Sequence, residues 1–302
     1  MSEIIKIENL NKSFGNLQAV KNLSFSVERG ELFAFLGVNG AGKSTTISII
    51  SGTLEKDGGT VTIDGKNIES DMAEICGETG VVFQSSALDG CLSVYDNLLT
   101  RAGLYGISGA KAKARIEELS ELLDFKDLLP RTLGKLSGGQ RRRIDVARAL
   151  IHSPAILILD EPTTGLDPQT RKTLWKVVKD LRKNDGMTVF LTTHYMEEAA
   201  EADHVVILNA GEIVAEGTPV ELKNKYTGDF ITVYGVDEKD VTKLSKTYEA
   251  VAGGYRIAVK NTEEARDLIT AYPDIFKDFE VEKGKMDDVF LAVTGRRAGD
   301  ND

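Results

Sequence analysis

The sequence has few cysteines, no long apolar run and no excess of positive charge. The two cysteines, Cys76 and Cys91, have a spacing that fits no metal-binding pattern, and one possible disulfide in 302 residues argues weakly for a reducing compartment. The longest apolar runs, such as "AILIL" at 155–159, are far shorter than the roughly 20 residues of a membrane-spanning helix. The N-terminus lacks an apolar signal-peptide core. We therefore expect a soluble, cytosolic protein whose membrane role, if any, requires a partner.

The charge balance argues against nucleic acid as a partner. The chain has 47 acidic and 37 basic residues, which gives a formal net charge of −10. Such a balance provides no long-range attraction to DNA, RNA or anionic lipid. A hydrophobic content of 41% is enough for a packed core, and the length predicts one large domain or two smaller ones.

The apolar pattern predicts an α/β core. Strand-like segments occur before residue 85, and helical periodicity at about 87–153 predicts a helical insertion. Two further buried strands are expected at 155–162 and 187–194, with a helix from Pro168 to about Lys183 between them. Strands separated by helices indicate a mostly parallel sheet covered on both faces. The early strands are expected at 3–10, 22–27, 31–37, 60–68 and 79–84.

The pattern changes near Lys225. From there the order strand-helix-strand-strand-helix-strand, with one last helix, predicts a small α+β domain. Asn261 or Thr262 should cap its second helix. The predicted domains are therefore 1–224 and 225–302.

A phosphate loop is predicted in "GVNGAGKST". The segment fits G-x-x-x-x-G-K-[ST] and lies between an expected strand and an expected helix. Backbone amides can turn inward there as an anion nest, Lys43 would neutralise the β- and γ-phosphates, and Ser44 would bind Mg²⁺. The expected nucleotide-binding residues are Gly37, Asn39, Gly40, Ala41, Gly42, Lys43, Ser44 and Thr45.

Polar residues end three other expected strands. In "ILILDEP", Asp160 would hold Mg²⁺ and Glu161 would orient or deprotonate the attacking water. Gln84 could reach Mg²⁺ or the same water, and His194 could hydrogen-bond the γ-phosphate. Each of these residues alone would more often be structural, but the phosphate loop in the same chain favours catalysis.

A second glycine-rich stretch, "KLSGGQRRR", begins a helix. Ser137 and Gln140 have the spacing of a capping box, and the glycine-lined helix end is a second anion site. Gly138 and Gly139 should each weaken the helix by roughly 1 kcal/mol relative to alanine, so something must approach the backbone closely. The simplest interpretation of the arginines is an exposed face, and we expect that for Arg141, Arg142 and Arg143.

Together these motifs, with "TTGLDPQT" at 163–170, resemble the ATP-binding subunit of an ABC transporter over residues 3–220. The resemblance implies a P-loop NTPase core with a mixed sheet, an N-terminal antiparallel β-subdomain and a helical subdomain. It also implies ATP and Mg²⁺ as cofactors and a head-to-tail pair of subunits, in which "LSGGQ" of one copy covers the ATP of the other. Asp167 would lie at the seam between the copies, and Phe14 would stack on adenine where many relatives have tyrosine.

Finer likenesses point to ABC-2 type exporters, including the drug-efflux group. They imply an integral membrane permease that docks near residues 85–130, with "SSALDGCLSVYDNL" at 85–98 as the coupling surface, and a peripheral location on the cytoplasmic face of the membrane. The alternatives are a non-transport ATPase of the same superfamily and a regulatory nucleotide-binding module without turnover. The domain at 225–302 is expected to be regulatory or dimer-supporting, or to be a stabilising appendage.

Overall fold

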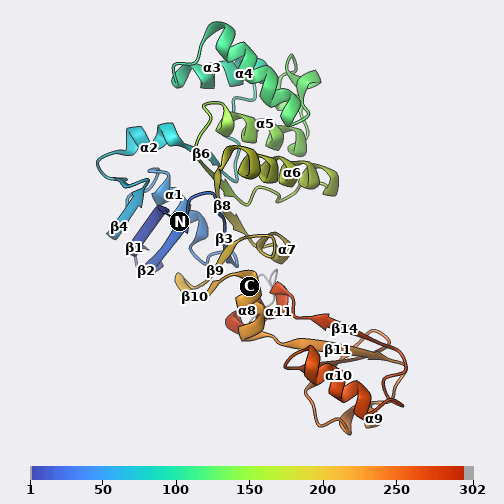
Figure 1. The fold of residues 1–302 in the computed structure, drawn as a ribbon. Helices are drawn as coiled ribbons and strands as arrows, with labels where there is room; N and C mark the ends of the chain where they lie inside the picture. The colour runs from blue at the N-terminus through green and yellow to red at the C-terminus, as the bar shows by residue number, and fades with distance from the viewer. Residues whose placement is uncertain (1, 296–302) are drawn as a thin grey trace. The chain divides into compact units, whose positions relative to one another are not determined.

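The computed structural model describes residues 2–295, so the predicted domain ends at residue 1 and at 296–302 lie outside the described residues. The chain divides into two compact units, one that ends at Val214 and one that begins at Ala215 (Figure 1). The first unit contains two sheets and the second unit one, and each unit has its own buried core.

The first unit begins with an antiparallel sheet. Its strand order is β2-β1-β4-β5. In the middle of β1 the buried Ile5 and Ile7 alternate with the exposed Lys6 and Glu8, as expected for a sheet with one solvated face. The strands are β1 (Glu3–Phe14), β2 (Leu17–Glu28), β4 (Gly58–Ile63) and β5 (Lys66–Asn67).

The second sheet of this unit has six strands in the order β10-β9-β3-β8-β7-β6. From β6 to β9 all neighbouring strands are parallel. Every residue of β3, β7 and β8 is buried, which explains why these strands are continuous apolar runs. The α/β fold with a mixed sheet is confirmed. The strands are β3 (Leu32–Gly37), β6 (Thr79–Val82), β7 (Ile156–Asp160), β8 (Thr188–Thr193), β9 (His204–Asn209) and β10 (Glu212–Gly217).

An aromatic cluster joins the two sheets. The ring of Phe25 on β2 lies 5.3 Å from that of Phe33 and 5.1 Å from that of Phe35, both on β3. Phe190 on β8 packs against the same rings. Rings at these distances bury large apolar areas and attract one another, so the strand that leads into the phosphate loop is held in a rigid core.

The helices of this unit agree with the expected periodicity. In Figure 1, α3, α4 and α5 form a helical layer, and Ile116, Leu119 and Leu123 are buried while Leu122 is partly exposed. Helix α2 was not predicted. None of the described helices is both long enough and apolar enough to span a bilayer. The helices are α1 (Lys43–Ile50), α2 (Met72–Glu78), α3 (Val94–Leu104), α4 (Gly109–Leu122), α5 (Gly138–Leu150), α6 (Pro168–Asp185) and α7 (Met196–Ala199).

The second unit is a four-stranded antiparallel sheet with helices, in the strand order β12-β13-β11-β14. Asn261 caps α10 by accepting a hydrogen bond from the Glu264 amide at 2.9 Å. Helix α8 was not predicted. The elements are α8 (Pro219–Tyr226), β11 (Asp229–Tyr234), α9 (Glu238–Thr242), β12 (Tyr248–Val251), β13 (Gly254–Val259), α10 (Thr262–Ala271), β14 (Phe279–Lys283) and α11 (Met286–Thr294).

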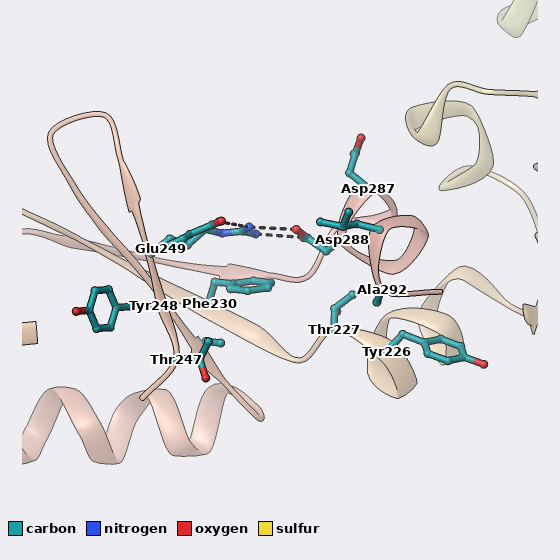
Figure 2. A pocket seen from close by; sticks show the side chains of 12 residues that line it. Tyr226, Thr227, Phe230, Thr247, Tyr248, Glu249, Asp287, Asp288 and Ala292 are labelled. Carbon is teal, nitrogen blue, oxygen red and sulfur yellow. Dashed lines mark hydrogen bonds and ion pairs between the residues drawn. The ribbon is translucent and has the colours of Figure 1, made fainter. Parts of the chain in front are cut away.

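One arginine ties the last helix of this unit to its sheet. Arg256 on β13 donates two hydrogen bonds to the Asp288 carboxylate, at 3.0 and 3.1 Å (Figure 2). This bidentate pairing fixes α11 in both position and orientation.

We predict that His152 makes the stability of the first unit depend on pH. Its ring is stacked on Tyr105 at 3.8 Å between centroids, and burial lowers its pKa to about 4. Between about pH 6.5 and pH 4 the unfolded chain therefore binds a proton that the folded chain does not, so the free energy of unfolding should fall as the pH falls through that window.

Urea unfolding at pH 7 and pH 5 checks this expectation. His152→Gln should reduce the difference in unfolding free energy between the two pH values. An unchanged difference would show that His152 does not contribute to it.

Candidate functional site

The phosphate loop connects the end of β3 to the start of α1. Its backbone requires glycine at Gly42, which has a φ of 106°, because a Cβ there would lie 2.6 Å from the Ala19 carbonyl oxygen. Gly37 is similarly restricted, since its Cβ would lie 2.9 Å from the Leu208 carbonyl oxygen. Asn39 and Gly40 are exposed, so the rim of the loop is open to a ligand.

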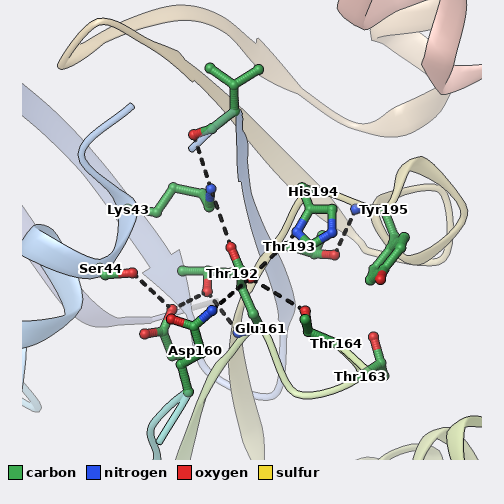
Figure 3. A network of polar contacts seen from close by, with 12 residues as sticks. Lys43, Ser44, Asp160, Glu161, Thr163, Thr164, Thr192, Thr193, His194 and Tyr195 are labelled. Atoms are coloured by element: carbon green, nitrogen blue, oxygen red, sulfur yellow. Dashed lines mark hydrogen bonds and ion pairs between the residues drawn. The ribbon is translucent and has the colours of Figure 1, made fainter. Parts of the chain in front are cut away.

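Lys43 lies folded back into this loop. It is 5% exposed, and its Nζ donates to the carbonyl oxygens of Gly37 at 2.7 Å and Val38 at 3.2 Å. Burial lowers the pKa of Lys43, and the Glu161 carboxylate, whose Oε1 is 3.6 Å from Nζ, opposes this shift. Figure 3 shows the Lys43 ammonium directed toward Glu161. A triphosphate bound in the loop would be an anionic partner for the Lys43 ammonium. The two carbonyl oxygens take the place of such a partner only in part.

A set of oxygen atoms lies beside the loop. Ser44 Oγ donates to Asp160 Oδ1 at 3.4 Å, and Thr192 Oγ1 donates to the same oxygen at 2.6 Å. Asp160 is 5% exposed. A hydroxyl and a carboxylate in contact are the hard ligands that Mg²⁺ prefers, so these side chains fit a magnesium ion that is also bound by phosphate.

Glu161 is the centre of the polar network in Figure 3. It follows β7 with a φ of 45°, an uncommon backbone conformation for a residue with a side chain. Its Oε2 accepts hydrogen bonds from Gln84 Nε2 at 3.4 Å and Thr164 Oγ1 at 3.3 Å, and lies 3.5 Å from His194 Nδ1. The four side chains for which we predicted catalytic roles, on Lys43, Gln84, Glu161 and His194, therefore meet at one carboxylate.

The second glycine-rich stretch begins α5 with the expected capping box. The Gln140 amide donates to Ser137 Oγ at 3.3 Å, and the Ser137 amide donates to Gln140 Oε1 at 3.0 Å. A Cβ on Gly139 would lie 3.2 Å from Thr170 Oγ1, so this glycine allows α6 of the same chain to approach. Among residues 2–295, no heavy atom outside its neighbours lies within 4 Å of the place that a Cβ would take at Gly138.

Asp167 caps α6. It accepts hydrogen bonds from the Thr170 amide at 3.0 Å and the Thr170 hydroxyl at 2.6 Å, and the hydroxyl bond lowers its pKa. Since Gly139 packs against Thr170, the "LSGGQ" and "GLDPQ" segments are neighbours within one chain.

The expectation that Arg142 belongs to an exposed face is wrong. Arg142 is 9% exposed, and its guanidinium donates to four main-chain carbonyls, those of Phe83, Asp160, Glu161 and Pro162, at 2.5–3.1 Å. Arg143 is partly buried and bonds Leu123 and Asp124, so only Arg141 is exposed as expected. The side chain of Arg142 reaches the catalytic strand ends because one side of α5 faces the sheet.

Phe14 lies at the tip of the β1–β2 hairpin. Its side chain is 49% exposed, so it is not packed in the core, and Lys12 Nζ lies 5.7 Å from the ring centroid. An exposed ring beside a cation is available to stack on a base, but its role stays a prediction.

Sequence reasoning missed Glu198, which is 4% exposed on α7. Its carboxylate accepts hydrogen bonds from the hydroxyls of Thr163 and Thr193 and from Trp175 Nε1. Thr193 directly precedes His194, and Thr163 lies two residues after Glu161. Glu198 belongs to the acidic segment "MEEAAEA" at 196–202. A charged residue on a short helix is usually solvated, so the sequence did not mark Glu198 as buried.

The family model described as "ABC transporter" matches residues 20–164. The linearmycin resistance ATP-binding protein LnrL of Bacillus subtilis is 36% identical over 98% of this chain and 100% of its own length. This chain belongs to the family of ABC transporter ATP-binding subunits. The Nod factor export ATP-binding protein I of Burkholderia lata is 35% identical over 98% of both chains. The subunit is accordingly an ATPase that serves a transporter, and neither alternative is favoured.

Solved structures agree with this assignment. A dimeric ATP-binding cassette bound to ADP and Pi in a post-hydrolysis state superposes with a TM-score of 0.67 and 28% identity, over 71% of this chain and 98% of that one. The cbiO1 protein of Clostridium perfringens, part of the ABC transporter complex cbiONQ, gives a TM-score of 0.66 and 29% identity over 74% and 92%. The fold of an ABC ATPase subunit is thereby shown.

We predict that Arg142→Ala lowers the free energy of unfolding by about 3 kcal/mol, because four buried carbonyl oxygens lose their donor. Urea unfolding of the full chain measures this change. Arg141→Ala is the matched control, and its exposed side chain should change stability by less than about 0.5 kcal/mol. Equal effects of the two substitutions would contradict a stabilising role for the four hydrogen bonds of Arg142.

Proposed function

We propose that this ABC ATPase subunit drives an exporter by binding and hydrolysing MgATP between two copies of the chain. The observation that carries the proposal is the convergence of Lys43, Gln84 and His194 on the Glu161 carboxylate. The side chains expected to bind phosphate, to activate water and to contact the γ-phosphate would then all lie around the Glu161 carboxylate.

Each residue has a role that follows from its chemistry. The loop amides and Lys43 bind the β- and γ-phosphates, and Ser44 and Asp160 hold Mg²⁺, which supplies positive charge to the phosphate oxygens. Glu161 orients the attacking water and accepts its proton, since it is the carboxylate one residue beyond the magnesium ligand. Gln84 and His194 contact the same carboxylate; Gln84 would also reach Mg²⁺ or the attacking water, and His194 would hydrogen-bond the γ-phosphate.

The dimer explains the second glycine-rich stretch. The open space at Gly138 and the free amides at the start of α5 would accept the phosphates of ATP held by the other copy. Asp167, next to this helix end, would lie at the seam, and Phe14 would stack on the adenine. The solved cassette with similar structure is a dimer, which supports this arrangement.

The membrane partner would dock on residues 85–130, with 85–98 as the coupling surface. Leu92 and Leu99 are 38% and 37% exposed there, which suits an apolar contact with a permease. The subunit would then work at the cytoplasmic face of the membrane. Export as the direction is supported by relatives named for drug resistance and Nod factor export.

The domain proposed for 225–302 lies outside this reaction. We propose a regulatory or dimer-supporting role for it. It would act without contributing a residue to the nucleotide site described above.

We predict that Glu161→Gln lowers kcat for ATP hydrolysis by at least about 100-fold, because the amide cannot accept the proton of the attacking water. ATP should then accumulate in the closed site, and light scattering should find twice the monomer mass in MgATP. Glu197→Gln on the exposed face of α7 is the matched control and should keep wild-type turnover.

The outcomes separate the parts of the proposal. Unchanged turnover in Glu161→Gln would reject Glu161 as the base. Lost turnover with a strictly monomeric protein in MgATP would reject the shared site and leave the role of Glu161 intact.

A further inference from the structure

The second unit contains a cavity of about 520 Å³ whose lining includes none of the predicted nucleotide-binding residues. This volume is within the range of small-molecule sites, roughly 300–1,000 Å³. Its lining comes from α8, β11, β12, β13 and α11, all of which belong to the second unit. Figure 2 shows Phe230 in its middle, between Thr247 on one side and Thr227 with Ala292 on the other.

The cavity is apolar over much of its wall and contains one aromatic ring. Phe230 contributes its ring, whereas the rings of Tyr226 and Tyr248 point away from it in Figure 2, and Leu291, which lines the cavity from α11, is 39% exposed. A leucine left this exposed in a cavity with an aromatic ring is suited to contact the apolar body of a ligand.

The only cation among the described lining residues is already paired. The Arg256 guanidinium lies 3.6 Å above the Phe230 ring centroid, is held bidentately by Asp288, and lies 3.3 Å from Glu249 Oε1. Two carboxylates therefore compensate one guanidinium. Asp287 adds a third carboxylate, and it is exposed.

The surface next to the cavity is also mainly negative. A second hollow shares three acidic lining residues with the cavity and has two more of its own: Glu249, Asp287, Asp288, Glu280 and Glu282. Its basic lining residues are Arg256 and Lys285. Negative charge over a low-dielectric wall attracts cations and repels phosphates and carboxylates. The cavity is therefore not a second nucleotide site.

We propose that this cavity binds a small organic cation with a flat apolar body. Phe230 and Leu291 would contact the apolar body, and the exposed carboxylate of Asp287 with the acidic rim would attract the cationic group. Arg256 shows that the face of Phe230 accepts a planar cation in this environment. The proposal does not depend on the assignment of the ATPase residues.

Titration of the nucleotide-free full chain with ethidium, followed by fluorescence anisotropy and calorimetry, tests the site. Ethidium is a flat aromatic cation, and 8-anilinonaphthalene-1-sulfonate is an aromatic anion of similar size. We expect one ethidium per chain and at least about tenfold weaker binding of the anion, with ethidium binding weakened by 0.5 M NaCl. Absence of ethidium binding, or equally tight binding of the anion, would overturn the proposal.

Two substitutions locate the bound cation. Asp287→Asn removes an exposed charge, and Phe230→Leu keeps an apolar side chain but removes the ring, so each should weaken ethidium binding about threefold. Asp274→Asn removes an exposed carboxylate that lines neither hollow, and it should leave the affinity unchanged. Thermal unfolding checks that the variants fold. If Phe230→Leu does not fold, Asp287→Asn decides, and wild-type affinity in that variant would overturn the proposal.

Discussion

The catalytic edge of the sheet depends on one buried guanidinium. The guanidinium of Arg142 donates to the main-chain carbonyl just beyond β6 and to those of the last residue of β7 and the two residues after it, and burial lowers its pKa although the charge of Asp145 opposes this shift. Removing such a charge from water is costly unless every donor finds an acceptor, so the two strand ends must keep the positions that provide them. Gln84 and Glu161 follow those carbonyls directly along the chain. The positions of these two residues therefore depend on a residue of the helix that begins with "LSGGQ", which couples the order of this helix to that of Glu161, the carboxylate proposed as the base.

A second constraint is the opposition of Lys43 and Glu161. Both side chains are at least 90% buried and lie 3.6 Å apart, in a space that a triphosphate and its metal would enter. Without nucleotide each partly neutralises the other, and the loop carbonyls satisfy the lysine. Binding of phosphate would give Lys43 a stronger partner and leave Glu161 to Gln84, Thr164 and His194. In the proposed mechanism, the Glu161 charge that pairs with Lys43 in the empty site would become available for chemistry when the site fills.

Local signals in the sequence predicted the parts of the fold that are locally determined. The glycine spacing at 37–42 predicted the loop because a Cβ at Gly42 has no room, and Ser137 with Gln140 predicted the cap because both bonds close within one turn. The continuous apolar runs predicted the buried parallel strands. Arg142 and Glu198 could not be predicted in this way, because their partners lie 18 to 59 and 5 to 35 residues away along the chain. The hollow around Phe230 was missed for the same reason, since five separate elements line it.

The buried carboxylate of Glu198 has a mechanical consequence. It holds Thr163, Thr193 and the Trp175 indole at once, and thereby fastens the segment after Glu161, the segment before His194 and the body of α6 to a single point. Three such segments cannot shift independently without stranding a negative charge away from water. A displacement of His194 on loss of the terminal phosphate, if it occurs as proposed, would therefore also move α6, and with it Asp167 at the start of that helix.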